Sequence, residues 1–144
     1  VACERAPIQL NHLARLRFAA EIGRRRCFNR GNVAAFEVDH VIAQKHGGAT
    51  EPDNLALSCP LCNQHKGTDL ASVDPETGAL TPLFHPRRER WEHHFCLTPD
   101  GVVPLTAVAR ATVRLLQLNR PARVAERALL IAARLLHTEG QGAR

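Results

Sequence analysis

The spacing of apolar residues indicates where the elements of this chain begin and end. From about residue 7 to 22 apolar residues recur at helical spacing, and Pro7 near the start and Gly23 after the end fit the boundaries of a helix. Over residues 35–42 apolar and polar residues alternate instead, which is the period of a strand. These two segments predict an N-terminal helix followed by a strand.

The segment after this strand completes a small unit. Gly47-Gly48 and Pro52-Asp53 predict a long turn or loop, and residues 54–57 can form a short return strand. A cysteine knuckle then leads into a short helix from residue 60 to about 70. Residues 35–70 are therefore predicted to fold as strand, loop, strand and helix.

The rest of the chain is predicted to be mainly helical. Residues 74–78 carry a strong turn signal, and residues 87–95 fit a short helix. Thr106 can cap a helix that reaches Leu118, and Pro121 suits the first turn of a last helix that ends near residue 137. The arginines of these two helices are expected either on solvated faces or on a phosphate-binding surface: Arg110, Arg114, Arg123 and Arg127.

Elements in this order predict an α+β fold in one domain, residues 1–144, because compact domains usually run about 100–200 residues. Residues 1–32 form the N-terminal helix and an upstream cysteine segment. Residues 33–70 form the strand–loop–strand–helix unit, and residues 71–144 form a turn, a hairpin and the C-terminal helices.

Charge and cysteine content narrow the classes of function. Lys plus Arg outnumber Asp plus Glu by 19 to 14, and the net charge of +5 suits a phosphate-rich partner, although a solvated arginine-rich surface gives the same excess. No run of 18 apolar residues predicts a membrane span, and no signal-peptide pattern opens the chain, so we expect a cytoplasmic protein. The five cysteines, two of them in a CxxC, then favour metal binding over disulfides.

Four polar residues in the middle of the chain can carry chemistry: Asp39, His40, Asn54 and Asn63. Histidine suits a general base, and a carboxylate with an amide oxygen suits a hard divalent cation, so Asp39 and Asn63 are the candidate metal ligands. Asn54 could fix the loop or orient the base. Since adjacent strand residues face opposite sides, Asp39 and His40 can share a site only if the strand ends, bulges or bends there.

These residues resemble the HNH endonuclease motif. The stretch FEVDHVIAQKHGGATEPDNLALSCPLCNQHKGTDL looks like the family's ββα-metal core, in which strand, loop, strand and helix surround one catalytic metal. The resemblance continues through DPETGALTPLFHPRRERWEHHF and, more weakly, LTAVARATVRLLQLNRPARV, as in a bacterial HNH subfamily. The pattern of apolar residues places helices before and after this core. The resemblance implies metal-dependent hydrolysis of phosphodiester bonds in nucleic acid, with DNA as the expected substrate.

The resemblance also implies a role for each motif residue. His40 would be the general base that takes a proton from the attacking water, and Asp39 and Asn63 would hold one divalent cation, Mg²⁺ or Mn²⁺. Asn54 would position the loop, and Asn63 at the third position makes this the H-N-N variant. The products would carry 5′-phosphate and 3′-hydroxyl ends. The main alternative is a module that keeps the fold and only binds nucleic acid; a secreted toxin nuclease or a zinc-ribbon scaffold ranks lower.

The cysteines raise the question of a second metal, because many HNH proteins carry a structural zinc held by two CxxC pairs. Cys59 and Cys62 supply one pair, but upstream only Cys27 is present, since Arg30 occupies the partner position. The ligand set is therefore incomplete, and the cysteines could be small buried hydrophobes. Alternatively, the zinc could survive with a substitute ligand: His65, Cys3 or Cys96. His65 could instead bind the catalytic metal or a phosphate.

Basic residues around the motif are the candidates for contacts with the nucleic-acid backbone. The phosphate-binding candidates are Lys66, His85, Arg87 and Arg88, and Arg24–Arg26 and Arg90 are expected to help hold the backbone. A capping or packing role for His85 is equally open. No element that would read bases in a groove can be identified, and the oligomeric state is left open.

Overall fold

The strand predicted around Asp39 and its return strand pair with each other. In the computed structural model, which describes residues 37–134, β1 (Glu37–His40) pairs antiparallel with β2 (Leu55–Ser58). Between them the chain forms two 3-10 helices, η1 (Gln44–His46) and η2 (Pro52–Asn54). The predicted N-terminal helix lies outside the described residues.

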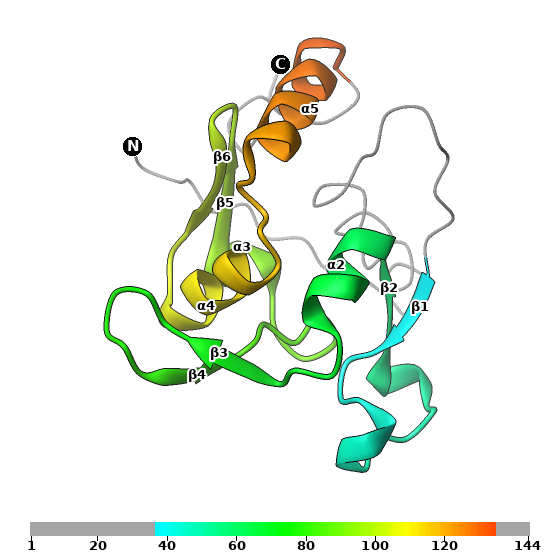
Figure 1. Ribbon diagram of the computed structural model, residues 1–144. Coiled ribbons are helices and arrows are strands. Elements are labelled where there is room, and N and C mark those ends of the chain that lie inside the picture. The colour runs from blue at the N-terminus through cyan, green and yellow to red at the C-terminus, as the bar shows by residue number, and fades with distance from the viewer. Residues whose placement is uncertain (1–36, 135–144) are drawn as a thin grey trace.

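Helix α2 (Pro60–Lys66) completes the predicted unit and packs against β1 (Figure 1). Cys59 caps its N-terminus by accepting a hydrogen bond from the Cys62 backbone N–H, and Pro60 occupies the first turn, where a missing N–H costs nothing. Gly67, with φ of +50°, ends the helix at Lys66, four residues before the predicted end near Leu70. The predicted order of strand, loop, strand and helix is confirmed.

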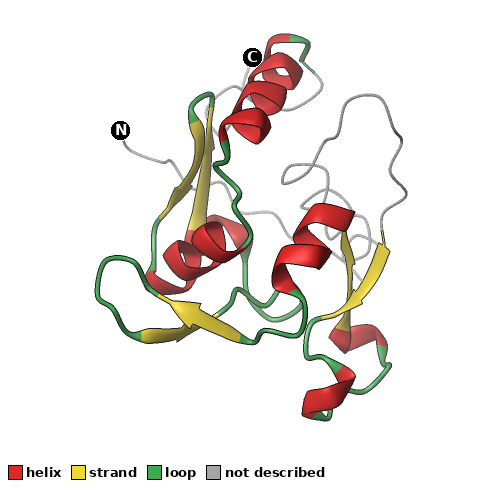
Figure 2. Cartoon of the chain, viewed as in Figure 1, coloured by secondary structure: helices red, strands yellow, loops and turns green. Residues whose placement is uncertain are grey.

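Two further hairpins follow. β3 (Ala71–Val73) pairs with β4 (Leu80–Pro82), and β5 (Phe95–Thr98) pairs with β6 (Gly101–Pro104), both antiparallel. The first hairpin turns around Asp74, which is fully buried and accepts hydrogen bonds from the backbone of Glu76, the hydroxyl of Thr77 and the guanidinium of Arg110. Within the described residues, each sheet therefore has two strands, and the fold is α+β (Figure 2).

Three helices belong to this part of the chain. α3 (Trp91–His94) is a single turn, shorter than predicted over 87–95, and α4 (Ala107–Leu115) and α5 (Pro121–Ala132) follow. Helix α4 contacts β3, β4 and β6. As predicted, the side chain of Thr106 caps α4, accepting from the Ala109 N–H, and Pro121 opens α5. None of the helices in residues 37–134 has the length and apolar character that crossing a bilayer requires.

The core forms two clusters that Val113 of α4 connects. The larger contains the aromatic residues Phe84, Trp91 and Phe95, in which Trp91 stacks on Phe95 with ring centroids 4.1 Å apart. The smaller joins Cys59 and Cys62 of the strand–helix unit to the end of α4 through two leucines, Leu116 and Leu118. The second cluster therefore packs the strand–loop–strand–helix unit against the C-terminal part of the chain.

Two arginines of α5 lie in this interior. The expectation of solvated or phosphate-binding positions for Arg123 and Arg127 is wrong, because their exposed fractions are 6% and 1%. Arg123 donates to the Leu116 carbonyl, and Arg127 donates to the Leu118 carbonyl, so both satisfy carbonyl groups at the end of α4. Buried guanidinium groups need such partners, which only the tertiary fold supplies.

Candidate functional site

The adjacent residues Asp39 and His40 lie where β1 ends. The strand stops at His40, and the chain bends at residues 41 and 42, so the two residues are the last two of β1. Asp39 is opposite Ala56 and His40 is opposite Leu55 in the antiparallel pair. One of the conditions for a shared site, a strand that ends at this point, is met.

Asn54 holds the loop that follows His40. Its Oδ1 accepts from the Ile42 N–H at 2.8 Å, and its Nδ2 donates to the carbonyls of Ile42 at 2.9 Å and Ala49 at 2.8 Å. Its backbone carbonyl accepts from the Val41 N–H at 2.8 Å. Because these bonds join both ends of the 41–54 segment, the amide fixes the path of the chain on leaving His40.

Gly48 makes this closure sterically possible. A Cβ at this position would lie 1.7 Å from the Ile42 carbonyl oxygen and 2.9 Å from Nδ2 of Asn54, far inside van der Waals contact. The backbone at Gly48 therefore approaches the backbone of Ile42 more closely than a residue with a side chain allows.

A contact with Thr50 orients the ring of His40. Its Nε2 lies 2.9 Å from Oγ1 of Thr50, which also accepts a hydrogen bond from the Gln44 side chain at 3.1 Å. If the imidazole donates Nε2–H to this hydroxyl, its lone pair is on Nδ1, since the bond at one ring nitrogen selects the tautomer. The ring is partly exposed, so a base at this position can reach a water molecule.

Helix α2 contacts β1 through two polar pairs. Asn63 donates from Nδ2 to Oε2 of Glu37 at 2.7 Å, and Lys66 lies with Nζ 3.0 Å from Oδ2 of Asp39. Lys66 also donates to the carbonyls of His40 at 2.9 Å and Gly67 at 3.3 Å. These three contacts use all three N–H donors of the ammonium, so in this arrangement Lys66 is directed at the protein rather than at a ligand phosphate.

The donor set fits a hard cation such as Mg²⁺ but forms no dense metal cluster. Within residues 37–134 no three His, Cys, Asp or Glu side chains are grouped as a metal site. Mg²⁺ usually keeps several waters and takes one or two protein oxygens, so one carboxylate with one amide is sufficient. Asp39 has a second carboxylate oxygen besides the one near Lys66, and the hydrogen bond from Nδ2 of Asn63 to Glu37 leaves its Oδ1 for a ligand.

A comparison with known protein families matches the same segment of the chain. The family model described as HNH endonuclease matches residues 25–69. This segment is similar to the HNH endonuclease family. No curated protein and no solved structure matches the chain. The matched segment contains β1, the loop, β2 and α2, and its similarity to this family suggests a nuclease or another nucleic-acid-related function.

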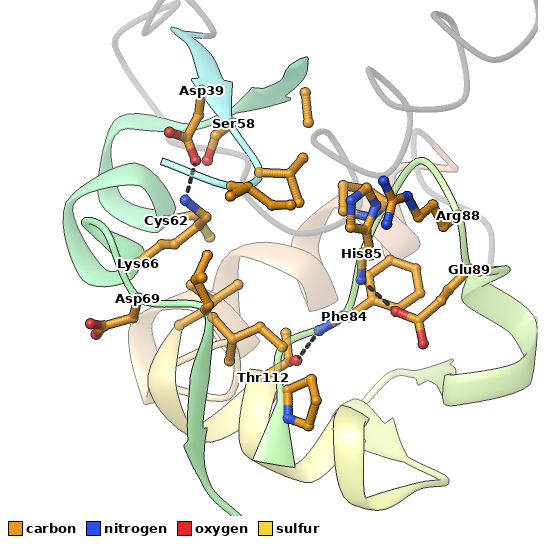
Figure 3. A pocket seen from close by; sticks show the side chains of 18 of the residues that line it. Asp39, Ser58, Cys62, Lys66, Asp69, Phe84, His85, Arg88, Glu89 and Thr112 are labelled. Carbon is orange, nitrogen blue, oxygen red and sulfur yellow. Dashed lines mark hydrogen bonds and ion pairs between the residues drawn. The ribbon is translucent and has the colours of Figure 1, made fainter. Parts of the chain in front are cut away.

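A cavity of about 420 Å³ borders the matched segment (Figure 3). Asp39 and Lys66 line it from the side of this segment, and His85 and Arg88 line it from the connection between β4 and α3. The structure thus brings three of the four phosphate-binding candidates, Lys66, His85 and Arg88, to the same cavity as the metal-ligand candidate Asp39.

The ring of His85 carries a hydrogen-bond donor that has no partner among residues 37–134. Its Nδ1 accepts from the Arg87 N–H at 3.3 Å, which places the ring proton of the neutral form on Nε2. That Nε2 is buried and has no hydrogen-bond partner among the described residues. Burial of the ring, followed by the nearby Arg88 guanidinium, lowers the pKa of His85, so the imidazole is neutral near pH 7.

The other candidates for phosphate or metal contacts lie either in structural contacts or at exposed positions. Arg87 donates from Nε to the Leu55 carbonyl at 2.5 Å, which ties the later segment to the start of β2. Arg88 and Arg90 are exposed, and Arg90 pairs with Glu92 at 2.7 Å. His65 lies on α2 two residues after Asn63, so it points away from that amide on a regular helix. Arg24–Arg26 lie outside the described residues.

The CxxC pair is buried at the start of α2. The thiols of Cys59 and Cys62 are not joined in a disulfide, and Arg123 donates to Sγ of Cys62 at 3.4 Å. Cys27 and Cys3 lie outside the described residues. Cys96, on β5 of another hairpin, is disulfide-bonded, so the prediction that it could complete a zinc site is wrong. Residues 37–134 thus supply two of the thiolates that a zinc site needs and a cation beside one of them.

Two residues of the site were not predicted from the sequence. Thr50 orients His40, and Glu37 binds Asn63. A signal for Glu37 was present, because residues two apart on a strand share a face and Glu37 precedes Asp39 by two. No local signal identifies Thr50, whose contact with His40 depends on the path of the loop.

Proposed function

We propose that this protein is a metal-dependent endonuclease that hydrolyses phosphodiester bonds in nucleic acid, with DNA as the substrate. The observation that carries the proposal is the arrangement at the end of β1. The strand ends at His40, Asn54 and Gly48 hold the loop after it, and α2 presents Asn63 beside the same strand. The match of this segment to the HNH endonuclease family supports it.

His40 acts as the general base. With Nε2–H donated to Thr50, the lone pair on Nδ1 takes a proton from the attacking water. The hydrogen bond to Thr50 also stabilises the ring once it is protonated, because a cationic donor forms a stronger bond than a neutral one. Thr50 thereby keeps the base in one orientation through the reaction.

Asp39 and Asn63 would hold a divalent cation, Mg²⁺ or Mn²⁺, with a carboxylate and an amide oxygen. When bound, such a cation would stabilise charge on the phosphate and on the leaving 3′ oxygen. Arg88, which is exposed on the far wall of the cavity, contacts the phosphate as a cation. The Nε2–H of His85 beside it is buried and reaches the phosphate once the side chains that cover it move. These contacts position the backbone without reading its sequence.

A plasmid-nicking assay tests the proposal. We expect the wild-type protein to nick plasmid DNA with Mg²⁺ or Mn²⁺ and to lose this activity in EDTA. His40→Ala should remove cleavage while binding in a gel shift remains, and Thr50→Val should reduce the rate about tenfold or more, since a displaced base is costly. If the wild-type protein binds DNA but does not cleave it at any concentration of either cation, the proposal that it is an endonuclease is wrong.

One observation favours a second candidate, a module that binds nucleic acid without cutting it. The ammonium of Lys66 already neutralises Asp39, at 3.0 Å, and a cation must share that carboxylate. The EDTA comparison separates the candidates, because the binding module would hold DNA equally well with and without a divalent cation.

A further inference from the structure

Glu37 is the residue of this site to which neither the motif nor the family match gives a role. It is the first residue of β1 and shares a face with Asp39, and its side chain is exposed. Its carboxylate accepts a hydrogen bond from Nδ2 of Asn63 at 2.7 Å, a short distance for a bond from an amide nitrogen. The two residues lie 26 positions apart in the chain, so this contact is a product of the fold.

The chemistry of the pair determines which end of the amide faces Glu37. An ionised carboxylate can only accept hydrogen bonds, and the two ends of an asparagine amide are a donor NH₂ and an acceptor oxygen. The NH₂ must therefore point at Glu37, and the oxygen must point elsewhere. No hydrogen bond to that oxygen from a residue in 37–134 is present, so it can take a ligand.

We propose that Glu37 is a positioning residue that orients the Asn63 amide so that its oxygen, and not its NH₂, faces the cation. The proposal rests on the function proposed above, since it concerns the same metal. Without Glu37 the two ends of the amide are nearly equal in size and can exchange places. A cation would then meet the NH₂ for part of the time, and its affinity would fall.

This role differs from that of a metal ligand, and the two respond differently to substitution. Glu37→Gln keeps an oxygen that accepts from Asn63 and removes the charge, whereas Glu37→Ala removes both. Because Glu37 is exposed, neither change should disturb the fold, and unfolding midpoints should stay close to that of the wild type. Glu51, an exposed acid in the loop of the same segment, provides matched controls, Glu51→Gln and Glu51→Ala.

The experiment measures Mn²⁺ binding to the full chain in the absence of nucleic acid, by electron paramagnetic resonance of the free ion, and Mn²⁺-dependent nicking in parallel. We expect Glu37→Ala to weaken Mn²⁺ binding about tenfold. This is the lower end of the loss of metal affinity that follows when a residue supporting a metal ligand is removed. Glu37→Gln should stay within about threefold of the wild type, since a neutral acceptor keeps roughly half the strength of the bond. Both Glu51 variants should bind as the wild type does.

Two outcomes would overturn this inference alone. If the wild type binds Mn²⁺ and cleaves, and Glu37→Ala binds equally well, Glu37 has no part in the site. If Glu37→Gln binds as weakly as Glu37→Ala, the charge itself contacts the cation and Glu37 is a ligand. Wild-type protein that neither binds Mn²⁺ nor cleaves would instead defeat the proposed function, and this inference with it.

Discussion

Replacement of Asn54 by aspartate tests whether the loop amide organises the site. Asparagine and aspartate have the same shape, but aspartate has no N–H to donate. Its carboxylate can still accept from the Ile42 N–H, while the two bonds to the carbonyls of Ile42 and Ala49, at 2.9 and 2.8 Å, become contacts between acceptors. The change therefore removes two of three side-chain hydrogen bonds and keeps the volume of the residue.

The cost can be estimated from these contacts. Each lost bond contributes about 0.5–1.5 kcal/mol, so the pair accounts for roughly 1–3 kcal/mol of the free energy of unfolding. Repulsion between the carboxylate and the two carbonyls adds to this, and a total of about 2–3 kcal/mol is expected. For a domain of this size the melting temperature should fall by roughly 6–12 °C. The path of the chain after His40 should change as well, which we expect to slow cleavage at least about tenfold.

Asn119→Asp provides a control in the other half of the fold. Asn119 makes a similar pair of bonds to the backbone of Val102, accepting and donating at 2.8 Å, but its oxygen also lies 3.3 Å from Arg127, which an aspartate can pair with. We expect this variant to lose about 1 kcal/mol or less and to keep its cleavage rate.

The assay combines urea denaturation, followed by the fluorescence of the single tryptophan, with plasmid nicking at a temperature at which every variant is folded. The reasoning is refuted if Asn54→Asp is as stable as the wild type. It is also refuted if Asn119→Asp loses cleavage to the same extent, because the effect would then follow from general destabilisation.

Three further changes test other parts of the account. Lys66→Met should tighten Mn²⁺ binding about threefold in a direct titration, since a partly exposed ion pair to Asp39 contributes ~0.6 kcal/mol; unchanged or weaker binding contradicts this. Gly48→Ala should lower stability in urea by at least about 2 kcal/mol, because its Cβ would lie 1.7 Å from a carbonyl oxygen, whereas Gly47→Ala, with nothing within 4 Å, should cost about 1 kcal/mol for its positive φ. Hydrogen bonds from Arg110, with smaller contributions from neighbouring donors, hold the pKa of Asp74 well below its usual value of 3.8, so this carboxylate stabilises the fold above that pH and the stability is lost as the pH falls below it. Urea midpoints from pH 5 to 2 should therefore fall steeply in the wild type and less in Asp74→Asn, and equal slopes contradict the assignment.

Much of the strand–loop–strand–helix unit could be predicted because its sequence signals are local. The change of period at residue 35, the glycines of the loop and the CxxC before a helix predict β1, β2 and α2 to within a few residues. Thr106 and Pro121 likewise mark the starts of α4 and α5, since capping depends on neighbouring residues only. A hairpin is expected within residues 71–144 without strand bounds, and the structure has two there, β3–β4 and β5–β6, the second of which turns at Pro99-Asp100.

What could not be predicted depends on contacts between distant residues. The burial of Arg123 and Arg127 follows from carbonyl groups at the end of α4, and their helical spacing alone indicates a solvated face. The link between Glu37 and Asn63 joins β1 to α2, and only the packing of the helix on the strand creates it. In each case a polar group gains its role from a partner that the local pattern does not specify.

The central claim is that Asp39 and Asn63 offer oxygen ligands to one divalent cation beside His40. Anomalous diffraction from crystals soaked in Mn²⁺ tests it directly. The account predicts one strong peak at bonding distance from a carboxylate oxygen of Asp39 and from Oδ1 of Asn63, with Glu37 holding the amide from the other side. A peak bound elsewhere, or Asn63 presenting its nitrogen to the ion, contradicts it.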